Sequence, residues 1–249
     1  MPLPPIGAHL LVFNSKYDYE ADMDLILDTV RDAGFRSVEG RMNDPRTFKA
    51  KLDERGLALG GYHVGLDKLN DVQPLIDYLG VTDCRDVCNS GVGKWHDVTA
   101  DDIRAAADVL NRAGRQLRDA DIRLHYHNHA FEFEPVGNGR TMMDVLIEQL
   151  DLDVVDLCVD VAWVSRGGHD PASFLRQYAA HVGYIHLKDH EGETWKELGQ
   201  GTLDFDAIMP VIAEMPNVRW AMVEQDRTDR DPVESCRISA AFLRDRGEL

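Results

Sequence analysis

The chain has 249 residues, of which 44% are hydrophobic and 29% are charged, a composition typical of a soluble globular protein and unlike that of a disordered or membrane protein. This length is sufficient for one large core and by itself allows one or two domains. The 44 acidic residues outnumber the 27 lysines and arginines, and we expect no nucleic-acid partner because a net charge of −17 repels phosphate backbones.

The apolar runs are all shorter than the roughly 20 residues that a membrane-spanning helix needs, so no membrane partner is expected. The N-terminal sequence MPLPPIGAHLLVF has no basic segment before its apolar part, and we therefore expect a cytoplasmic protein. Four cysteines in a chain of this length do not form a disulfide framework. Cys84 and Cys88 lack the CxxC spacing of a zinc site, which favours buried thiols.

Short apolar runs alternate with longer amphipathic segments along the chain, which predicts alternating strands and helices. Eight strands are predicted, at 6–13, 36–40, 58–64, 84–89, 122–129, 154–161, 182–187 and 218–224.

The intervening segments carry recognisable helix starts. These are capping boxes at Thr99 with Asp102 and Thr141 with Asp144, and Asp-Pro pairs at 170–171 and 231–232. Further helices are predicted at 19–33, 44–56, 67–80, 142–150 and 204–214. Pro210 should kink or shorten the last of them.

Eight strands that alternate with about eight helices predict an α/β protein with the (β/α)8 TIM barrel fold. We predict a single domain over residues 1–249, since no Pro/Gly/Ser-rich linker divides the chain. A doubly wound open sheet is the alternative, but no GxGxxG motif follows the first strand to support it. In a TIM barrel the chemistry takes place where the strands end and the loops begin, so polar residues at those positions are candidate site residues.

Three consecutive predicted strands end in polar side chains that metals bind. Asp160, His186 and Glu224 end the sixth, seventh and eighth strands, and Lys188 faces the same side as His186. Each residue taken alone also fits a structural role, such as a helix cap, a core histidine or a solvated carboxylate at the rim. Together they bring carboxylate and imidazole ligands to one mouth of the barrel.

The fifth strand lies in the sequence RLHYHNHAFEFE, residues 123–134. His125, His127 and His129 alternate along it and share one face, which we expect to point into the barrel. The alternative is a polar plug without chemistry. Beside the carboxylates of the next strands, the cluster favours a divalent-metal site, because mixed carboxylate and imidazole ligands suit Mn²⁺, Fe²⁺, Co²⁺ or Zn²⁺, whereas all-oxygen sites favour Mg²⁺ or Ca²⁺.

The motifs YHNHAFEF, DVAWVSRGGHDP, HLKDH, ELGQGTLDF and VEQD, in this order, resemble those of the xylose isomerase-like TIM barrels described as sugar phosphate isomerases/epimerases. The resemblance covers essentially the whole chain and is most specific in the C-terminal half. The N-terminal third contributes only the alternation of strands and helices, with Glu39 and His63 at strand ends. Relatives in this family include ketose 3-epimerases, hydroxypyruvate isomerase, inosose dehydratase and endonuclease IV.

The resemblance implies metal ligands on strands five to eight in the order Glu, Asp, His and Glu. Asp160, His186 and Glu224 match the last three of these. Mn²⁺ is the metal we expect, with Co²⁺, Mg²⁺, Fe²⁺ and Zn²⁺ as alternatives.

The strand-five ligand is where the chain departs from the epimerases. They carry a Glu in the middle of that strand, where this sequence has His125 and His127. Glu132 lies further along, at the position of a second Glu that contacts substrate in the epimerases. We predict Glu132 as the fourth ligand, with His127 as the alternative.

The resemblance implies a sugar or sugar phosphate isomerase/epimerase that forms an enediolate, with a small-molecule substrate and possible association into homo-oligomers. Glu224, and whichever of Glu132 and His127 does not bind the metal, are the candidate acid and base. The same residues could catalyse β-elimination from an inosose or 3-keto sugar, and the HNH strand favours this dehydratase or lyase alternative somewhat. The net negative charge argues against an apurinic endonuclease, which would have to bind DNA. A non-catalytic sugar-binding subunit is a further alternative hypothesis.

Several further side chains are candidates for orienting a sugar. They are His63, His125, His129, Trp163, His169, Lys188 and Glu197. Three of these residues also have a purely structural interpretation. Trp163 could pack in the core, His169 could lie beside a helix cap, and Lys188 could be solvated. The two glycines of ELGQGTLDF permit a tight loop over the barrel mouth.

Overall fold

The computed structural model describes residues 2–249, and its centre is a closed barrel of eight parallel strands. Around the barrel the strands follow the order β1-β12-β9-β8-β5-β4-β3-β2. They are β1 (Ile6–His9), β2 (Ser37–Glu39), β3 (Ala58–Gly65), β4 (Asp86–Ser90), β5 (Arg123–His127), β8 (Val155–Asp160), β9 (Val182–Leu187) and β12 (Trp220–Val223). The eight predicted strands and the TIM barrel fold are therefore confirmed.

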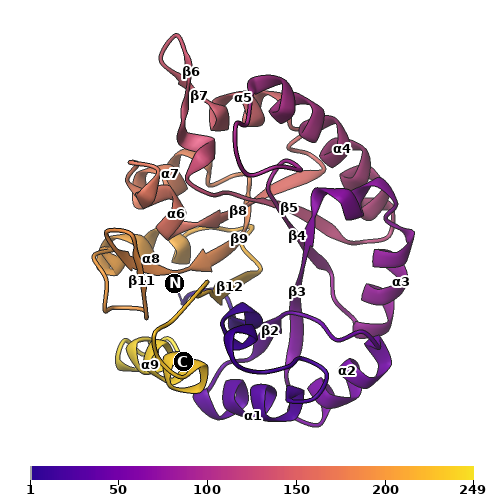
Figure 1. The fold of residues 1–249 in the computed structure, drawn as a ribbon, viewed down its shortest axis with the longest axis vertical. Helices are drawn as coiled ribbons and strands as arrows, with labels where there is room; N and C mark the ends of the chain where they lie inside the picture. Colours follow the sequence, from indigo (N-terminus) through magenta and orange to yellow (C-terminus); the bar gives the residue numbers. More distant parts are fainter. Residues whose placement is uncertain (1) are drawn as a thin grey trace.

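Helices surround the barrel (Figure 1). They are α1 (Met23–Ala33), α2 (Pro45–Asp53), α3 (Gln73–Thr82), α4 (Ala100–Asp119), α5 (Met142–Gln149), α6 (Val161–Arg166), α7 (Pro171–Tyr178), α8 (Phe205–Ala213) and α9 (Pro232–Asp245). The last helix, α9, packs beside α1, so the first and last helices of the chain are neighbours in the outer layer. No helix within residues 2–249 combines the length and the apolar character needed to cross a membrane.

Local signals in the sequence explain where several helices start. Both predicted capping boxes are present, with Thr99 capping α4 and Thr141 capping α5. The carboxylates of Asp170 and Asp231 accept backbone hydrogen bonds at the starts of α7 and α9. Helix α8 contains Pro210 and ends at Ala213.

The first strand is shorter than the predicted range 6–13. It ends at His9, whose ring nitrogen Nδ1 accepts a hydrogen bond from the backbone N–H of Leu11 at 3.0 Å. This bond caps the short 3-10 helix η1 (Leu10–Ser15), and hydrophobicity alone did not distinguish this helix from a strand. A similar 3-10 helix, η2 (Leu66–Asn70), occupies the start of the predicted helix 67–80, of which α3 is the second part.

Two hairpins outside the barrel were not predicted. One pairs β6 (Pro135–Gly137) with β7 (Arg140–Thr141) and projects from the helical layer (Figure 1). Asn138 and Gly139 at its tip have positive φ angles of 54° and 73°, as the turn of a tight hairpin requires. The other pairs β10 (Asp189–Glu191) with β11 (Thr194–Lys196) directly after β9.

The barrel interior is filled by side chains that alternate along the strands. Tyr184 of β9 is fully buried there, and Gly61 on the opposite strand β3 makes room for it, since a Cβ at Gly61 would overlap the Tyr184 hydroxyl. The polar residues lie one layer above, at the carboxyl ends of the strands.

Candidate functional site

Four buried side chains converge at the carboxyl ends of the barrel strands, and we call them the hard-ligand group. His127 ends β5, Asp160 ends β8, His186 lies one residue before the end of β9, and Glu224 follows β12 directly. One nitrogen or oxygen atom from each lies within 4.8 Å of the others. The parallel register, which pairs Asp160 with His186, brings residues of different strands to the same height.

The nitrogen and oxygen atoms of this group face one another but form no hydrogen bonds with one another. His127 Nε2 lies 3.6 Å from Asp160 Oδ2 and 3.4 Å from Glu224 Oε2, and His186 Nδ1 lies 2.5 Å from the same Glu224 oxygen. Although all four atoms are buried, none has a partner with hydrogen-bond geometry. Unsatisfied buried polar atoms are costly, and two imidazole nitrogens with two carboxylate oxygens are a donor set that a divalent transition metal binds well. The residues present therefore fit such an ion.

Asp160 is able to serve two roles because its two carboxylate oxygens point to different partners. Oδ1 accepts hydrogen bonds from the backbone N–H groups of Ala162 and Trp163, both at 2.9 Å, and so caps α6. Oδ2 belongs to the hard-ligand group. Asp160 thus caps a helix, which was the alternative role predicted for it, and also provides an oxygen atom to the hard-ligand group.

The second nitrogen of each histidine in the group is held by another side chain. His186 Nε2 lies 2.9 Å from Glu39 Oε2, and His127 Nδ1 lies 3.1 Å from Ser90 Oγ. His63 joins these two contacts, since its Nδ1 lies 2.8 Å from Glu39 Oε1 and its Nε2 bonds Ser90. Metal-binding histidines usually have their other nitrogen held in this way, which fixes the ring orientation and the tautomer.

The electrostatic state of the metal-free group follows from these contacts. Burial acts to lower the pKa of His127, but Asp160 and Glu224 outweigh it and raise the pKa to about 10. Burial opposes ionisation of Glu224, yet Lys188 and His186 lower its pKa well below its usual value. The carboxylate is therefore ionised and His127 carries a proton that an incoming cation would displace.

Lys188 is fully buried beside the group rather than solvated. Its Nζ lies 2.8 Å from Asp226 Oδ2, 3.5 Å from Asp160 Oδ2 and 3.6 Å from Glu224 Oε1. Burial acts to lower the pKa of Lys188, but the three carboxylates raise it above its usual value, so the ammonium stays charged. Its Nζ also lies 4.3 Å from the centre of the Trp195 ring, within the range of a cation–π contact.

A pocket of about 380 Å³ opens above the group, which is within the size range of small-molecule sites. Its lining includes His9, Tyr19, Arg41, His63, Ser90, Trp95, His127, His129, Glu224 and Asp226. Two residues predicted to contact substrate, His63 and His129, are thus on the pocket wall. Burial and the charge on His127 lower the pKa of His129 well below its usual value, so its ring is neutral.

Glu132, predicted as the fourth ligand, is not brought to the hard-ligand group. It lies in the 3-10 helix η3 (Phe131–Phe133), where its Oε1 accepts a hydrogen bond from the Tyr126 hydroxyl at 2.7 Å and its Oε2 accepts one from the His129 N–H at 2.8 Å. Tyr126 has the opposite parity to His127 along β5, so this contact lies behind the strand. The structure places His127 in the group instead.

His125 points into the barrel as expected but lies one layer below the pocket. Its Nε2 lies 2.9 Å from Asp86 Oδ1, and Arg219 approaches the other oxygen of Asp86 at 3.5 Å. Neither His125 nor Asp86 lines the pocket above the hard-ligand group. The position of His125 therefore does not support the predicted contact with substrate. The side chain lies among the buried polar residues that fill the barrel below the pocket.

The other predicted substrate residues lie around the mouth at various distances from the group. Trp163 packs edge-on against Trp195 with ring centres 4.6 Å apart, and His169 packs on Phe133 at 4.8 Å. Glu197 accepts a hydrogen bond from Thr228 at 2.8 Å. None of Trp163, His169 and Glu197 lines the pocket.

The glycine-containing run 197–205 does form a tight loop. The carboxylate of Asp189 holds it by accepting hydrogen bonds from the N–H groups of Gly199, Gly201 and Leu203 at 3.0, 2.9 and 3.2 Å. The loop is anchored on Asp189 of the β10–β11 hairpin.

Several pocket residues were not predicted from the sequence, among them His9, Arg41, Trp95 and Asp226, and neither was the role of Ser90. His9 was placed inside an overlong first strand, and the correct end of that strand would have singled it out. Asp226 stands in the VEQD motif and was not selected. Arg41 and Trp95 follow β2 and β4 in loops for which the sequence carries no distinctive motif.

Known proteins with a similar sequence include two inosose dehydratases. The chain is 25% identical over 249 aligned positions to an inosose dehydratase of Geobacillus kaustophilus, covering 82% of this chain and 80% of that one. It is 24% identical over 181 positions to an inosose dehydratase of Clostridium botulinum, which covers 63% of this chain and 58% of the relative's length.

Solved structures share the fold. A sugar phosphate isomerase/epimerase of Parabacteroides distasonis superposes with a TM-score of 0.81 at 21% identity, covering 98% of this chain and 94% of that one. A 3-keto-D-glucoside 4-epimerase of E. coli superposes with a TM-score of 0.76 at 16% identity, covering 97% and 99%. At these identities the likeness shows the fold alone.

A family model described as xylose isomerase-like TIM barrel matches residues 27–246, nearly the whole barrel. This chain belongs to the xylose isomerase-like TIM barrel family.

Proposed function

We propose that this protein is a divalent-metal-dependent sugar isomerase or epimerase that removes a proton next to a carbonyl group and forms an enediolate. The observation that carries the proposal is the convergence of four buried donor atoms without hydrogen-bond partners, from His127, Asp160, His186 and Glu224, at the floor of a pocket. Such a set is costly to maintain unless a cation fills it.

A divalent ion held by these four side chains would supply Lewis-acid stabilisation of the negative charge that develops on the carbonyl oxygen. The surrounding residues have separate tasks. Lys188 and Glu39 keep the carboxylate and imidazole groups in place, since Lys188 lies 3.6 Å from Glu224 Oε1 and Glu39 lies 2.9 Å from His186 Nε2.

Glu224 is the proton acceptor that we propose. It lines the pocket and is ionised, because Lys188 and His186 hold its pKa well below the usual value in spite of its burial. Asp226 lines the same pocket and can return the proton at the neighbouring carbon or on the other face. Burial raises the pKa of Asp226 above its usual value, which favours proton donation by this carboxyl.

The proposal is tested by metal analysis and isotope exchange. Purified protein should contain close to one divalent ion per chain, and Asp160→Asn should lose it. With ketoses in deuterated water, turnover should place deuterium at the carbon next to the carbonyl without loss of water from the sugar. Metal that Asp160→Asn retains in full would contradict the site.

A dehydratase acting on an inosose or another 3-keto sugar is the second candidate, and the similarity to inosose dehydratases favours it. Both reactions begin with the same proton removal, and they diverge when the intermediate either regains a proton or expels a β-hydroxyl group. Mass loss of one water from a keto-sugar substrate identifies the dehydratase, and deuterium incorporation at unchanged composition identifies the epimerase.

A further inference from the structure

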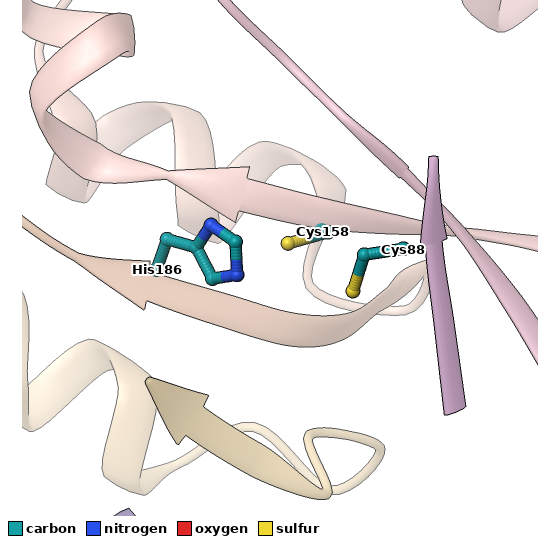
Figure 2. A group of neighbouring side chains, drawn as sticks. All are labelled: Cys88, Cys158 and His186. Carbon is teal, nitrogen blue, oxygen red and sulfur yellow. The ribbon is translucent and has the colours of Figure 1, made fainter. Parts of the chain in front are cut away.

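Two buried thiols lie directly beneath the hard-ligand group. Cys88 of β4 and Cys158 of β8 are fully inaccessible to solvent. Their sulfur atoms and one ring nitrogen of His186 all lie within 4.8 Å of one another. Figure 2 shows the three side chains directed into the space between their strands.

The position of the thiols follows from the strand periodicity. Cys88 lies two residues before Ser90, and Cys158 lies two residues before Asp160, so each thiol shares the inward face of its strand with a residue of the layer above. Ser90 lines the pocket and Asp160 belongs to the hard-ligand group. The thiols therefore form the next layer down, and one layer of side chains separates them from the pocket.

The strand order opposes a disulfide between the two cysteines. Strand β5 lies between β4 and β8, so their backbones are two strand spacings apart, roughly 9 Å, whereas a disulfide needs Cα atoms within about 7 Å. A metal ion bridges a longer gap. With metal–sulfur bonds of about 2.3 Å in tetrahedral geometry, two thiolates on one ion lie roughly 3.8 Å apart, which the observed spacing of at most 4.8 Å reaches with small side-chain movements.

We propose that Cys88, Cys158 and His186 form a second metal site, selective for soft or borderline cations such as Cd²⁺, Cu⁺ or Zn²⁺. Thiolate sulfur selects such cations over Mn²⁺ or Mg²⁺, and three protein ligands are the number found in zinc sites with one open position. Binding forms two metal–sulfur bonds and one metal–nitrogen bond, and it releases to solvent the two thiol protons and the proton on the coordinating His186 nitrogen, with no change of oxidation state. Because Nδ1 of His186 faces Glu224 and Nε2 bonds Glu39, a metal at the thiols replaces one of these two contacts of the ring. The packing of Tyr184 and Met222 around the thiols keeps the site dry.

Cadmium titration of the full-length, reduced protein, previously equilibrated with Mn²⁺, tests this site. Cadmium–thiolate bonds give an ultraviolet charge-transfer band that carboxylate and imidazole ligands do not give. We expect the band to saturate at about one Cd²⁺ per chain, and the double variant Cys88→Ala/Cys158→Ala to lose it. The matched controls Cys84→Ala and Cys236→Ala, which remove buried thiols elsewhere in the fold, should retain it.

Two further variants keep the test decisive. Cys158→Ser preserves the side-chain size and should weaken cadmium binding by about tenfold or more even if the double alanine variant does not fold. Asp160→Asn should lose Mn²⁺ while retaining the cadmium–thiolate band, so failure of one metal site is distinguishable from failure of the other. A wild-type protein without the band, or a folded thiol variant with the full band, overturns the second site.

Discussion

The carboxylate of Glu39 accepts a hydrogen bond from Nε2 of His186 at 2.9 Å, and this contact leaves Nδ1 of the same ring directed at Glu224. Burial opposes ionisation of Glu39, but His186 and His9 lower its pKa well below its usual value. Glu39 is thus a fixed negative charge behind a histidine that we propose as a metal ligand.

Glu39→Gln should weaken Mn²⁺ binding about 10-fold to 100-fold, because the amide loses the charge and can no longer accept bonds from both His186 and His63. Isothermal titration calorimetry with Mn²⁺ measures this change. Glu134→Gln, which alters an exposed carboxylate a short distance after β5, is the matched control and should bind Mn²⁺ as the wild-type protein does. Equal affinities in the two variants would remove Glu39 from this positioning role.

Substitutions in and after β5 decide between His127 and Glu132 as the fourth ligand. We expect His127→Asn to lower the metal content strongly and Glu132→Gln to leave it near the wild-type level, because only His127 has a donor atom in the hard-ligand group. Metal content per chain after dialysis is the measurement. The opposite order of the two variants would restore Glu132 as the ligand.

Glu132 should instead affect the pH dependence of stability. Burial raises its pKa to about 7 in the folded protein, against 4.5 for the free side chain. The folded state therefore binds the proton more tightly than the unfolded state, so the stability that this proton provides is present below pH 4.5 and is lost as the pH rises to about 7.

Glutamine does not ionise, so the Glu132→Gln variant does not lose this stability as the pH rises. The free energy of unfolding of the wild type relative to Glu132→Gln should fall between these pH values by up to roughly 3 kcal/mol, since a pKa difference of one corresponds to about 1.4 kcal/mol. Urea unfolding of both proteins across this range gives the difference. A difference that is constant with pH would mean that Glu132 titrates normally.

Lys188 provides the positive charge that stabilises three neighbouring carboxylates. Lys188→Met keeps the length of the side chain but leaves Asp160, Glu224 and Asp226 without the buried ammonium, which should cost roughly 3–5 kcal/mol in the metal-free protein. Saturating Mn²⁺ should recover part of this loss, because a divalent ion near the same carboxylates supplies the missing charge.

Thermal unfolding with and without Mn²⁺ measures both effects. Lys196→Met is the control, since its Nζ pairs with Glu191 at 3.3 Å on the β10–β11 hairpin and both side chains of this pair are partly exposed. Its loss should change stability by about 0.5 kcal/mol or less. If Mn²⁺ protects Lys188→Met no more than the wild type, the ion and the ammonium do not share these carboxylates.

The elements that were predicted correctly are those whose signals are local. Thr99 and Thr141 cap helices because the capping box needs only two residues three positions apart. The alternation of strands and helices indicates a barrel because each strand buries apolar residues on both faces. Asp160, His186 and Glu224 were identified because each one ends an apolar strand, and the structure brings these three together.

The fourth member of the group, His127, and the partners behind the histidines depended on the tertiary structure. Glu132 and His127 are five residues apart, and their separation to opposite sides of β5 follows from a 3-10 turn and from the Tyr126 hydroxyl that binds Glu132. Glu39 meets His186 although 147 residues separate them, because closure of the barrel pairs β2 with β1 and so places β2 only three strands from β9, across the interior.

The sequence by itself therefore determined the barrel and the types of side chain at its mouth, since strand periodicity and helix caps act over a few residues. Only the tertiary structure decided which histidine faces the carboxylates, that Lys188 is buried among them, and that two thiols lie beneath them. The physical reason is that strand stagger and barrel closure set the height of each side chain, and these arise from the packing of all eight strands together.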